Sequence, residues 1–299
     1  MSGRELSLTV LPERDGQTVE RVLRGELGLS KSLLGHLKWT PGAVRVNGAA
    51  ARCGESVRAG DVLTVLLEER RRPSEAPALC ELPLDIVYED ADLLVLNKPA
   101  GLPMHDRGGG PTLAGALRYH LGEDCSAHFV NRLDRGTSGL LIAAKSGYVH
   151  DRLRRALHTS ALEREYRALC HGMPEPPEGT VTLPIGPAEG RFYMRRVRPD
   201  GQSARTEYAV LERRADFCLL RLKPVTGRTH QLRVHMSALG CPLLGDMLYG
   251  APEGDPIARP ALHSYSLRFL HPLTGEALSF IVPLPEDVAR LLRRETGSA

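Results

Sequence analysis

Hydrophobic positions in the first seventy residues change their spacing, which predicts helices followed by strands. Apolar residues at 19–23 recur at the three-to-four-residue interval of one helix face. Ser30 is a suitable N-cap for a second helical stretch that follows it. Residues 44–46 instead alternate apolar and polar side chains, and Asn47-Gly48 is a strong hairpin signal. Residues 13–70 are therefore expected to form a small unit of two helices and a hairpin.

The pattern changes from residue 83, where short apolar runs outnumber helical segments. Charged residues and prolines at 71–82 predict a linker before this second unit, which extends over residues 83–295. A helix is expected at 147–159, with a row of arginines on its polar side. Many strands with few helices between them favour an α+β fold with a mixed, mostly antiparallel sheet. The expected strands cover residues 86–87, 93–96, 140–144, 166–169, 181–183, 206–211, 217–222 and 278–282.

Composition narrows the class of protein. The 299 residues are 42% hydrophobic and 25% charged, and the apolar runs are far shorter than the ~20 residues of a membrane helix. The N-terminus lacks the apolar core of a secretory signal, so a cytoplasmic protein is expected. The six cysteines form no C-x-x-C pair, and the eleven histidines form no H-E-x-x-H pair. With no phosphate-binding glycine loop or dinucleotide fingerprint either, we expect neither metal nor cofactor, and a monomer is the simplest assembly.

Charge is mildly positive overall and concentrated near the N-terminus. The net charge is +3, and residues 14–72 contain eleven Lys or Arg against seven Asp or Glu. Such clustering permits binding to nucleic acid, although charged residues of this kind are also common on solvated surfaces. The basic pattern S-K-x-x-L followed by G-x-V-x-V-N-G resembles the alpha-L RNA-binding motif first known from a ribosomal protein.

Three segments of the second unit carry candidate chemistry. Asp134 lies between Arg132 and Arg135 and precedes the sequence Gly-Thr-Ser-Gly, whose glycines allow a tight path into the strand at 140–144. Arg228 belongs to the basic segment T-G-R-T-H-Q-L-R-V-H, and Tyr166 to E-Y-R-A-L. Taken singly, these residues are equally consistent with a loop ion pair, a basic helix start and ordinary strand packing.

In order along the chain, these segments resemble the motifs of the RluA-type family of large-subunit pseudouridine synthases. The resemblance also includes N-K-P-A-G-L from Asn97, G-D-M-L-Y-G from Gly245 and A-L-H from Ala261, and spans residues 83–285. It implies an α+β pseudouridine synthase domain without a cofactor. One departure is Asn131, where many members carry His; we expect it to affect either the bracing of the loop or the subfamily to which the chain belongs, and not the activity.

The resemblance also implies roles for the three candidate residues. Asp134 would be the essential carboxylate, acting either as a nucleophile or as a general base on the ribose. Arg228 would pair with it and keep it ionised. Tyr166 would stack on the target uracil, which has to be flipped out of its helix before it can react, and could also help to remove the proton from the base.

The expected partner is structured RNA, with ribosomal RNA favoured and transfer RNA as the alternative. The expected phosphate contacts, which position RNA without reading its sequence, come from Lys31, Lys38, Arg132, Arg135, Arg195 and Arg196. Two other classes of protein agree less well with these residues. A non-catalytic RNA-binding or ribosome-assembly factor would not require all of Asp134, Tyr166 and Arg228. An Asp-dependent glycoside hydrolase would require a second carboxylate, and the motifs contain no clear partner for Asp134.

Overall fold

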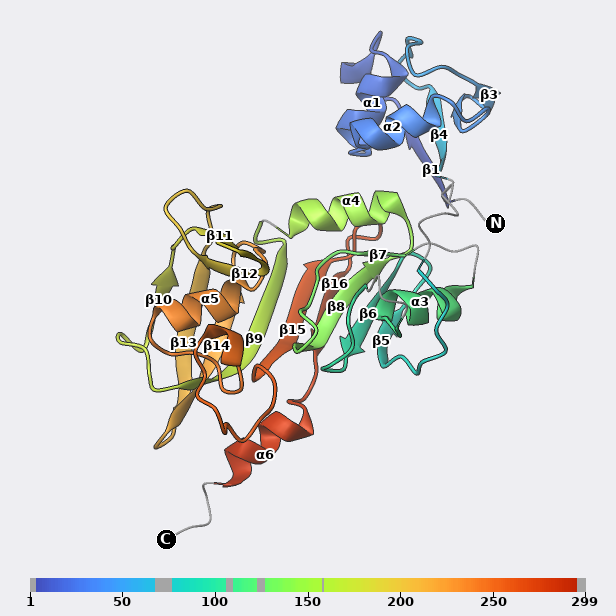
Figure 1. Cartoon of the computed structure of the whole chain (residues 1–299). Coiled ribbons are helices and arrows are strands. Elements are labelled where there is room, and N and C mark those ends of the chain that lie inside the picture. The colour runs from blue at the N-terminus through green and yellow to red at the C-terminus, as the bar shows by residue number, and fades with distance from the viewer. Residues whose placement is uncertain (1–3, 68–76, 106–109, 123–126, 158, 295–299) are drawn as a thin grey trace.

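The structure is a computed structural model that describes residues 4–67, 77–105, 110–122, 127–157 and 159–294. Its first unit is a small antiparallel sheet of strand order β1-β4-β2-β3, packed against two helices (Figure 1). The elements are β1 (Arg4–Thr9), α1 (Val19–Glu26), α2 (Lys31–Leu37), β2 (Val44–Val46), β3 (Ala49–Ala50) and β4 (Val62–Leu67).

Local sequence signals account for most of this unit. The Ser30 hydroxyl accepts the N–H of Leu33 at 3.2 Å and so caps α2, as expected. Asn47 and Gly48 both have positive φ, +50° and +82°, which is the conformation of a two-residue hairpin turn between β2 and β3. Strand β1 was not predicted, although Leu6 and Leu8 alternate with polar residues as in a half-buried strand; its pairing with β4 moves the start of the unit ahead of residue 13.

The second unit is built on a ten-stranded sheet of order β10-β13-β14-β9-β15-β8-β6-β5, with β16 paired to β15 and β7 to β8. Every pair is antiparallel except β15 with β8, so the expected mixed, mostly antiparallel sheet is confirmed. Its strands are β5 (Ile86–Glu89), β6 (Leu93–Lys98), β7 (His128–Phe129), β8 (Ser138–Ala144), β9 (Leu162–His171), β10 (Glu178–Val181), β13 (Thr206–Arg213), β14 (Phe217–Pro224), β15 (Leu262–Leu270) and β16 (Ala277–Ile281).

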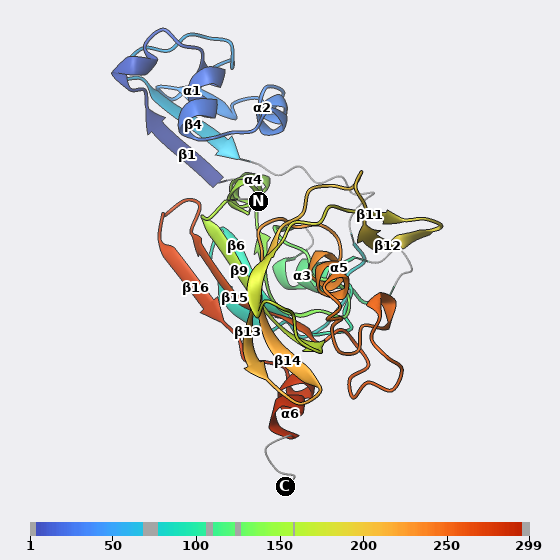
Figure 2. The same cartoon turned by 90° about the vertical axis from the view of Figure 1, so that its left-hand side faces the viewer.

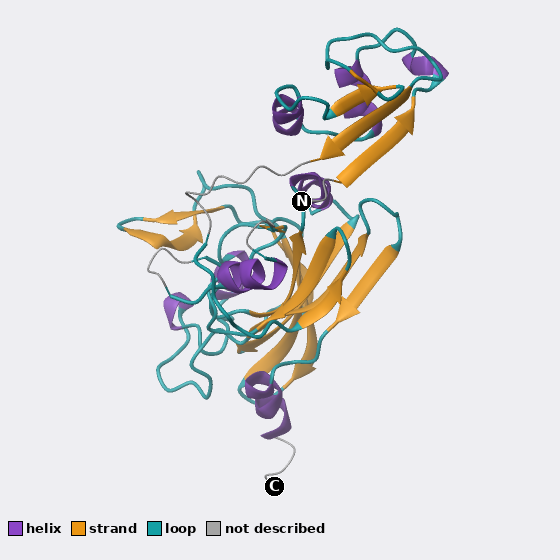
Figure 3. Cartoon of the chain, turned by 90° about the vertical axis from the view of Figure 1, so that its right-hand side faces the viewer, coloured by secondary structure: helices purple, strands orange, loops and turns teal. Residues whose placement is uncertain are grey.

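Strand β8 shows why the sheet needs cover on both faces. All seven of its residues are buried, and successive side chains point to opposite faces. Leu140, Ile142 and Ala144 belong to one apolar cluster, whereas Leu141 and Ala143 belong to another. Helix α4 (Gly147–Ala156) contributes to the first cluster, and helices α3 (Leu113–Leu121) and α5 (Gln231–Ala238) contribute to the second. The orange strands and the helices beside them are seen in Figure 3.

The remaining elements lie at the periphery of the sheet. The hairpin of β11 (Ile185–Ala188) and β12 (Arg191–Val197) projects from it. Short 3-10 turns at Pro12–Arg14 and Met247–Tyr249 and helix α6 (Glu286–Arg294) complete the chain. Within the described residues, no helix combines the length and the hydropathy needed to cross a bilayer.

Helix α4 of the second unit lies next to the first unit and forms hydrogen bonds to it (Figure 2). The Tyr148 hydroxyl donates to the carbonyl of Leu27 at 2.7 Å, and Arg155 donates to the carbonyl of Gly28 at 2.9 Å. These two carbonyls follow the end of α1, so α4 supplies donors for a helix terminus of the other unit. Of the expected linker, residues 71–76 lie outside the described part; residues 77–82 form no helix or strand, and Arg118 donates to the carbonyl of Pro77.

Candidate active site

A pocket of about 860 Å³ opens where the loop before β8, the end of α4, strand β9 and the start of α5 meet. Asp134, Tyr166 and Arg228 all line it, although they are far apart in sequence. The pocket therefore brings together the three residues that the sequence singled out. It also contains two basic residues that the sequence analysis did not name, Arg164 and Arg233.

The Asp134 loop takes its shape from the start of β8. Gly139 has φ of +106°, and a Cβ at this position would lie 2.2 Å from the carbonyl oxygen of Ser264 in β15. Only glycine fits this approach, which explains the glycine in the T-S-G sequence. The carbonyl of Asp134 accepts the N–H of Thr137 at 3.0 Å, which closes the turn and leaves the Asp134 side chain 29% exposed toward the pocket.

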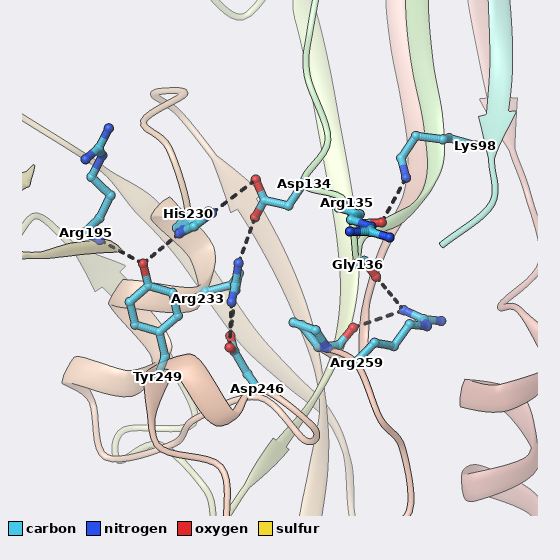
Figure 4. A network of polar contacts seen from close by, with 11 residues as sticks. Lys98, Asp134, Arg135, Gly136, Arg195, His230, Arg233, Asp246, Tyr249 and Arg259 are labelled. Carbon is cyan, nitrogen blue, oxygen red and sulfur yellow. Dashed lines mark hydrogen bonds and ion pairs between the residues drawn. The ribbon is translucent and has the colours of Figure 1, made fainter. Parts of the chain in front are cut away.

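Two cationic side chains fix the peptide groups that follow Asp134 (Figure 4). The Lys98 ammonium lies 3.3 Å from the carbonyl of Arg135, and Arg259 donates to the carbonyl of Gly136 at 3.1 Å. Lys98 is almost fully buried, and burial lowers its pKa to about 8. The loop backbone is thus held from β6 and from the segment before β15, so Asp134 is presented by a rigid support.

The cation that faces Asp134 is Arg233. Its Nη1 lies 3.4 Å from Asp134 Oδ2, while its Nε and Nη2 each lie 2.7 Å from the carboxylate of Asp246. Asp246 is 1% exposed, so this pair is a buried, bidentate contact with little freedom. Arg233 is thereby held with one nitrogen toward the pocket.

The expected pairing of Arg228 with Asp134 is wrong in this structure. The Arg228 Nε donates to the carbonyl of Ser203 at 2.9 Å, and the ion pairs of the described residues include none between Arg228 and Asp134. Arg228 precedes α5, and the Gln231 side chain accepts its backbone N–H at 3.0 Å. Arg228 still lines the pocket, but the guanidinium group next to the Asp134 carboxylate is that of Arg233, which lies inside α5.

His230 is a second residue that the sequence analysis missed. It has left-handed φ of +57°, which turns its ring toward the pocket, and its Nε2 lies 3.8 Å from Asp134 Oδ1. Its Nδ1 lies 2.7 Å from the Tyr249 hydroxyl, which also accepts the backbone N–H of Arg195 at 3.0 Å. Burial lowers the pKa of His230, and the nearby Asp134 partly offsets this, so the imidazole is neutral at pH 7. The available signal was its place in the segment T-G-R-T-H-Q-L-R-V-H, next to the start of α5.

Tyr166 lies in the middle of the sheet, in β9 between β14 and β15. It is 5% exposed, and burial raises the pKa of its phenol, which is therefore protonated at neutral pH. Arg164, two residues earlier on the same face of the strand, donates to the carbonyl of Pro224 at 3.0 Å. An aromatic ring, a carboxylate and fixed guanidinium groups thus surround one concave space that is large enough for a nucleotide.

Known proteins share this architecture and these segments. Residues 92–238 match the family described as RNA pseudouridylate synthase. The chain is 40% identical to the uncharacterized RNA pseudouridine synthase YjbO of Bacillus subtilis, over 91% of this chain and 97% of that protein. It is 38% identical to ribosomal large subunit pseudouridine synthase D of Vibrio vulnificus, over 97% and 95% of the two chains. The chain belongs to the RNA pseudouridine synthase family.

Solved structures agree with this assignment. Human RNA pseudouridylate synthase domain containing 4 superposes with a TM-score of 0.58 at 27% identity, covering 70% of this chain and 92% of that one. Human RNA pseudouridylate synthase domain containing 1 gives 0.57 at 28% identity, covering 77% and 98%. The resemblance to the RluA-type family is thus confirmed, and the chain is an isomerase of the pseudouridine synthase class that acts on RNA.

Asn131 braces the loop that carries Asp134. The residue is 4% exposed, and its Oδ1 accepts the N–H of Ile142 in β8 at 2.9 Å. The side chain therefore fastens the segment before Asp134 to a buried strand. Asn131 also lines the pocket, but the partner of its Oδ1 is a backbone N–H of the sheet, which agrees with a structural role for the position.

The residues expected to contact RNA fall into three places. Arg132 and Arg135 are exposed beside Asp134, and Arg135 donates to the carbonyl of Gly101. Arg195 and Arg196 lie on β12, where Arg196 pairs with Glu189. Lys31 and Lys38 are exposed on or beside α2 of the first unit. All six lie on the surface or partly buried, and none is enclosed in the core.

One group of side chains has the composition of a metal site but is already occupied by protein donors. Asp90, Asp92 and His271 have ligand atoms within 4.8 Å of one another. Asp90 accepts the Tyr88 hydroxyl at 2.7 Å and two backbone N–H groups, and Asp92 pairs with Arg4 of the first unit at 3.3 Å. We therefore interpret the group as a turn between β5 and β6 that also contacts β1.

Proposed function

We propose that this synthase converts uridines of ribosomal RNA to pseudouridine with Asp134 as the essential carboxylate. The observation that carries the proposal is the position of Asp134 in a pocket of about 860 Å³, partly exposed and facing Arg233. Ribosomal RNA is the proposed substrate because relatives named for the large ribosomal subunit match nearly the whole chain, with transfer RNA as the alternative. Such a substrate corresponds to a cytoplasmic enzyme, and we propose that it acts as a monomer.

The reaction breaks the bond between uracil N1 and the ribose and forms a bond from C5 to the same carbon. C5 loses a proton and N1 gains one, so atoms and electrons balance without an oxidant or a second substrate. The uridine has to leave its stack first, at a cost of roughly a few kcal/mol. Asp134 then acts either as a nucleophile or as a base at the ribose, and both roles require an ionised oxygen lone pair.

The neighbouring residues support this chemistry in different ways. Arg233 compensates the charge of Asp134 without donating a proton, because guanidinium remains protonated. The Tyr166 ring offers a stacking face for the flipped uracil, an interaction of ~1–3 kcal/mol in nucleic-acid complexes. Its neutral phenol favours this role over removal of the C5 proton.

Exposed basic residues would position the RNA around this pocket. Arg132 and Arg135 border the pocket, and Arg195 and Arg196 extend the positive surface along β12. We propose that residues 13–70, together with β1, form the RNA-binding unit that the alpha-L resemblance implies, with Lys31 and Lys38 contacting phosphates.

The proposal is tested by mapping pseudouridine in total RNA from cells with and without the gene. Loss of specific ribosomal sites, restored by the wild-type gene but not by Asp134→Asn, is the expected result. Loss of sites in transfer RNA alone would replace the proposed substrate. An unchanged map would instead favour a non-catalytic RNA-binding factor.

A further inference from the structure

Trp39 is the only tryptophan of the chain and is 86% exposed. It lies in the turn that ends α2. There, the backbone N–H of Trp39 donates to the carbonyl of His36, and the backbone N–H of Thr40 donates to the carbonyl of Leu37. The backbone is thus fixed while the indole projects into solvent. Its ring takes part in no stacking or cation contact with the other described residues. A large aromatic face presented in this way is a feature of binding surfaces rather than of packing.

A pocket of about 560 Å³ lies beside this ring, between the turn after α2 and residues 50–55. Lys38 and Arg52 line it and are both exposed. Glu55 also lines it, but its carboxylate already accepts the backbone N–H of Arg52 at 2.9 Å. The Lys38 ammonium forms an ion pair with Glu20 at 2.8 Å. Arg52 forms no ion pair with any residue the structure describes. The pocket therefore offers an aromatic wall and a positive rim.

A third basic residue adjoins this pocket. Arg45 is paired with Ala50 across the β2–β3 hairpin, and its Nε donates to the carbonyl of Gly42 at 3.2 Å. Both Ala50 and Gly42 line the pocket. An anionic ligand with a flat aromatic group matches this arrangement better than an acidic or purely apolar one, because it uses both the indole and the surrounding cations.

We propose that Trp39 stacks on an unpaired nucleobase of the bound RNA, with Arg52 and Arg45 contacting the flanking phosphates. This inference rests on the proposed function, since it requires that the chain binds RNA. Stacking on an indole requires an exposed base face, which a paired duplex offers only at its two ends. The ligand class is therefore a single-stranded or bulged segment next to the target helix, and the interaction tolerates any base.

The placement of α2 is compatible with one RNA reaching both sites. Figure 2 shows the first unit, which contains α2, next to α4 of the second unit. His150 and Arg154 of α4 line the main pocket. A structured RNA whose target uridine enters the main pocket can therefore present a neighbouring unpaired segment to Trp39.

Because the chain has one tryptophan, its fluorescence reports on this site alone. The full-length protein is titrated with a single-stranded oligouridylate and, separately, with a long RNA duplex, which has few ends per phosphate, at equal phosphate concentration. We expect the single strand to quench the tryptophan emission and the duplex to bind without quenching it. Equal quenching by both probes, or binding of the single strand without quenching, would overturn the stacking proposal.

Variants separate stacking from general affinity. Trp39→Ala should weaken binding of the single strand about tenfold, which corresponds to about 1.4 kcal/mol, and leave duplex binding unchanged. Trp39→Phe should recover most of the loss, because a phenyl ring also stacks. Tyr119→Ala removes an exposed aromatic from α3 of the other unit and serves as the matched control. If Trp39→Ala binds the single strand like the wild type, the inference fails; if the wild type binds RNA but forms no pseudouridine in any RNA, the proposed function fails instead.

Discussion

Arg233 and Asp246 form a buried bidentate ion pair that determines which arginine faces Asp134. The two contacts of 2.7 Å use Nε and Nη2 of Arg233, so Nη1 alone is left to approach Asp134. The Tyr249 ring, 4.8 Å from the guanidinium carbon, covers one face of the same group. An arginine restrained on its edge and on its face loses little conformational entropy when the pocket fills, which suits a residue that positions a carboxylate.

Replacement of Arg233 by lysine keeps the positive charge but should still lower the activity strongly. Lysine cannot make the two-nitrogen contact with Asp246 and still reach Asp134, so Arg233→Lys should lower kcat about a hundredfold. The matched control is Arg228→Lys, which changes a pocket residue bonded to the Ser203 carbonyl and should lower kcat by less than about tenfold. Single-turnover assays on substrate RNA measure both. A larger loss in Arg228→Lys than in Arg233→Lys would return Arg228 to the role expected from the sequence.

Asp134→Asn should remove pseudouridine formation and leave RNA binding within about threefold of the wild type. The substitution retains the shape of the side chain but not the anionic oxygen that either chemical role requires. Activity is measured by chemical labelling of pseudouridine and affinity by filter binding. Asp200→Asn, an exposed aspartate of the loop after β12, is the control and should behave as the wild type. Retained activity in Asp134→Asn would contradict the proposed mechanism.

The Tyr249 hydroxyl links the β11–β12 hairpin to the pocket, so its removal should affect catalysis more than stability. Tyr249→Phe preserves the ring over Arg233 but removes the bonds to His230 Nδ1 and to the Arg195 N–H. We expect kcat to fall about tenfold, with a smaller change in KM, because His230 is no longer held beside Asp134.

Tyr119→Phe is the control for loss of a phenolic hydroxyl, since Tyr119 is exposed on α3. If both variants have wild-type kcat, the His230–Tyr249 contact has no part in positioning Asp134.

His263 should make the folded protein sensitive to mild acid. It is 1% exposed, its Nδ1 lies 2.9 Å from the Ser138 hydroxyl, and burial lowers its pKa from 6.5 to about 4. The unfolded chain binds a proton between these two values and the folded chain does not. The contribution of His263 to the free energy of unfolding is therefore lost as the pH falls from about 6.5 to about 4, by about 2 kcal/mol between pH 7 and pH 5.

Urea unfolding at pH 7 and pH 5 tests this effect in the wild type and in His263→Asn. The asparagine can still bond to Ser138 but does not titrate, so the variant should lose about 2 kcal/mol less than the wild type between the two pH values. The same pH-dependent loss in both proteins would assign the acid sensitivity to other groups, such as the buried His235.

The amino-acid sequence alone determined the local structure wherever a side chain acts on its own backbone. Three features were predictable from short sequence patterns: the Ser30 cap, the Asn47-Gly48 turn and the apolar run of β8. A helix cap, a positive φ and burial on both faces of a strand each require particular residue types within a few positions. The ordered motifs likewise identified the family and placed Asp134 and Tyr166 in one pocket.

Only the tertiary structure decided which groups meet across the chain. Strand β1 has only a short alternation of Leu6 and Leu8 with polar residues, and its pairing with β4 supplies the hydrogen bonds that make it a strand. Arg228 and Arg233 are equivalent as cations in the sequence. What separates them is the start of α5 after His230 and the buried carboxylate of Asp246, which lies 13 positions further on. The direction of a long side chain depends on partners brought by folding, and no spacing rule along the chain contains that information.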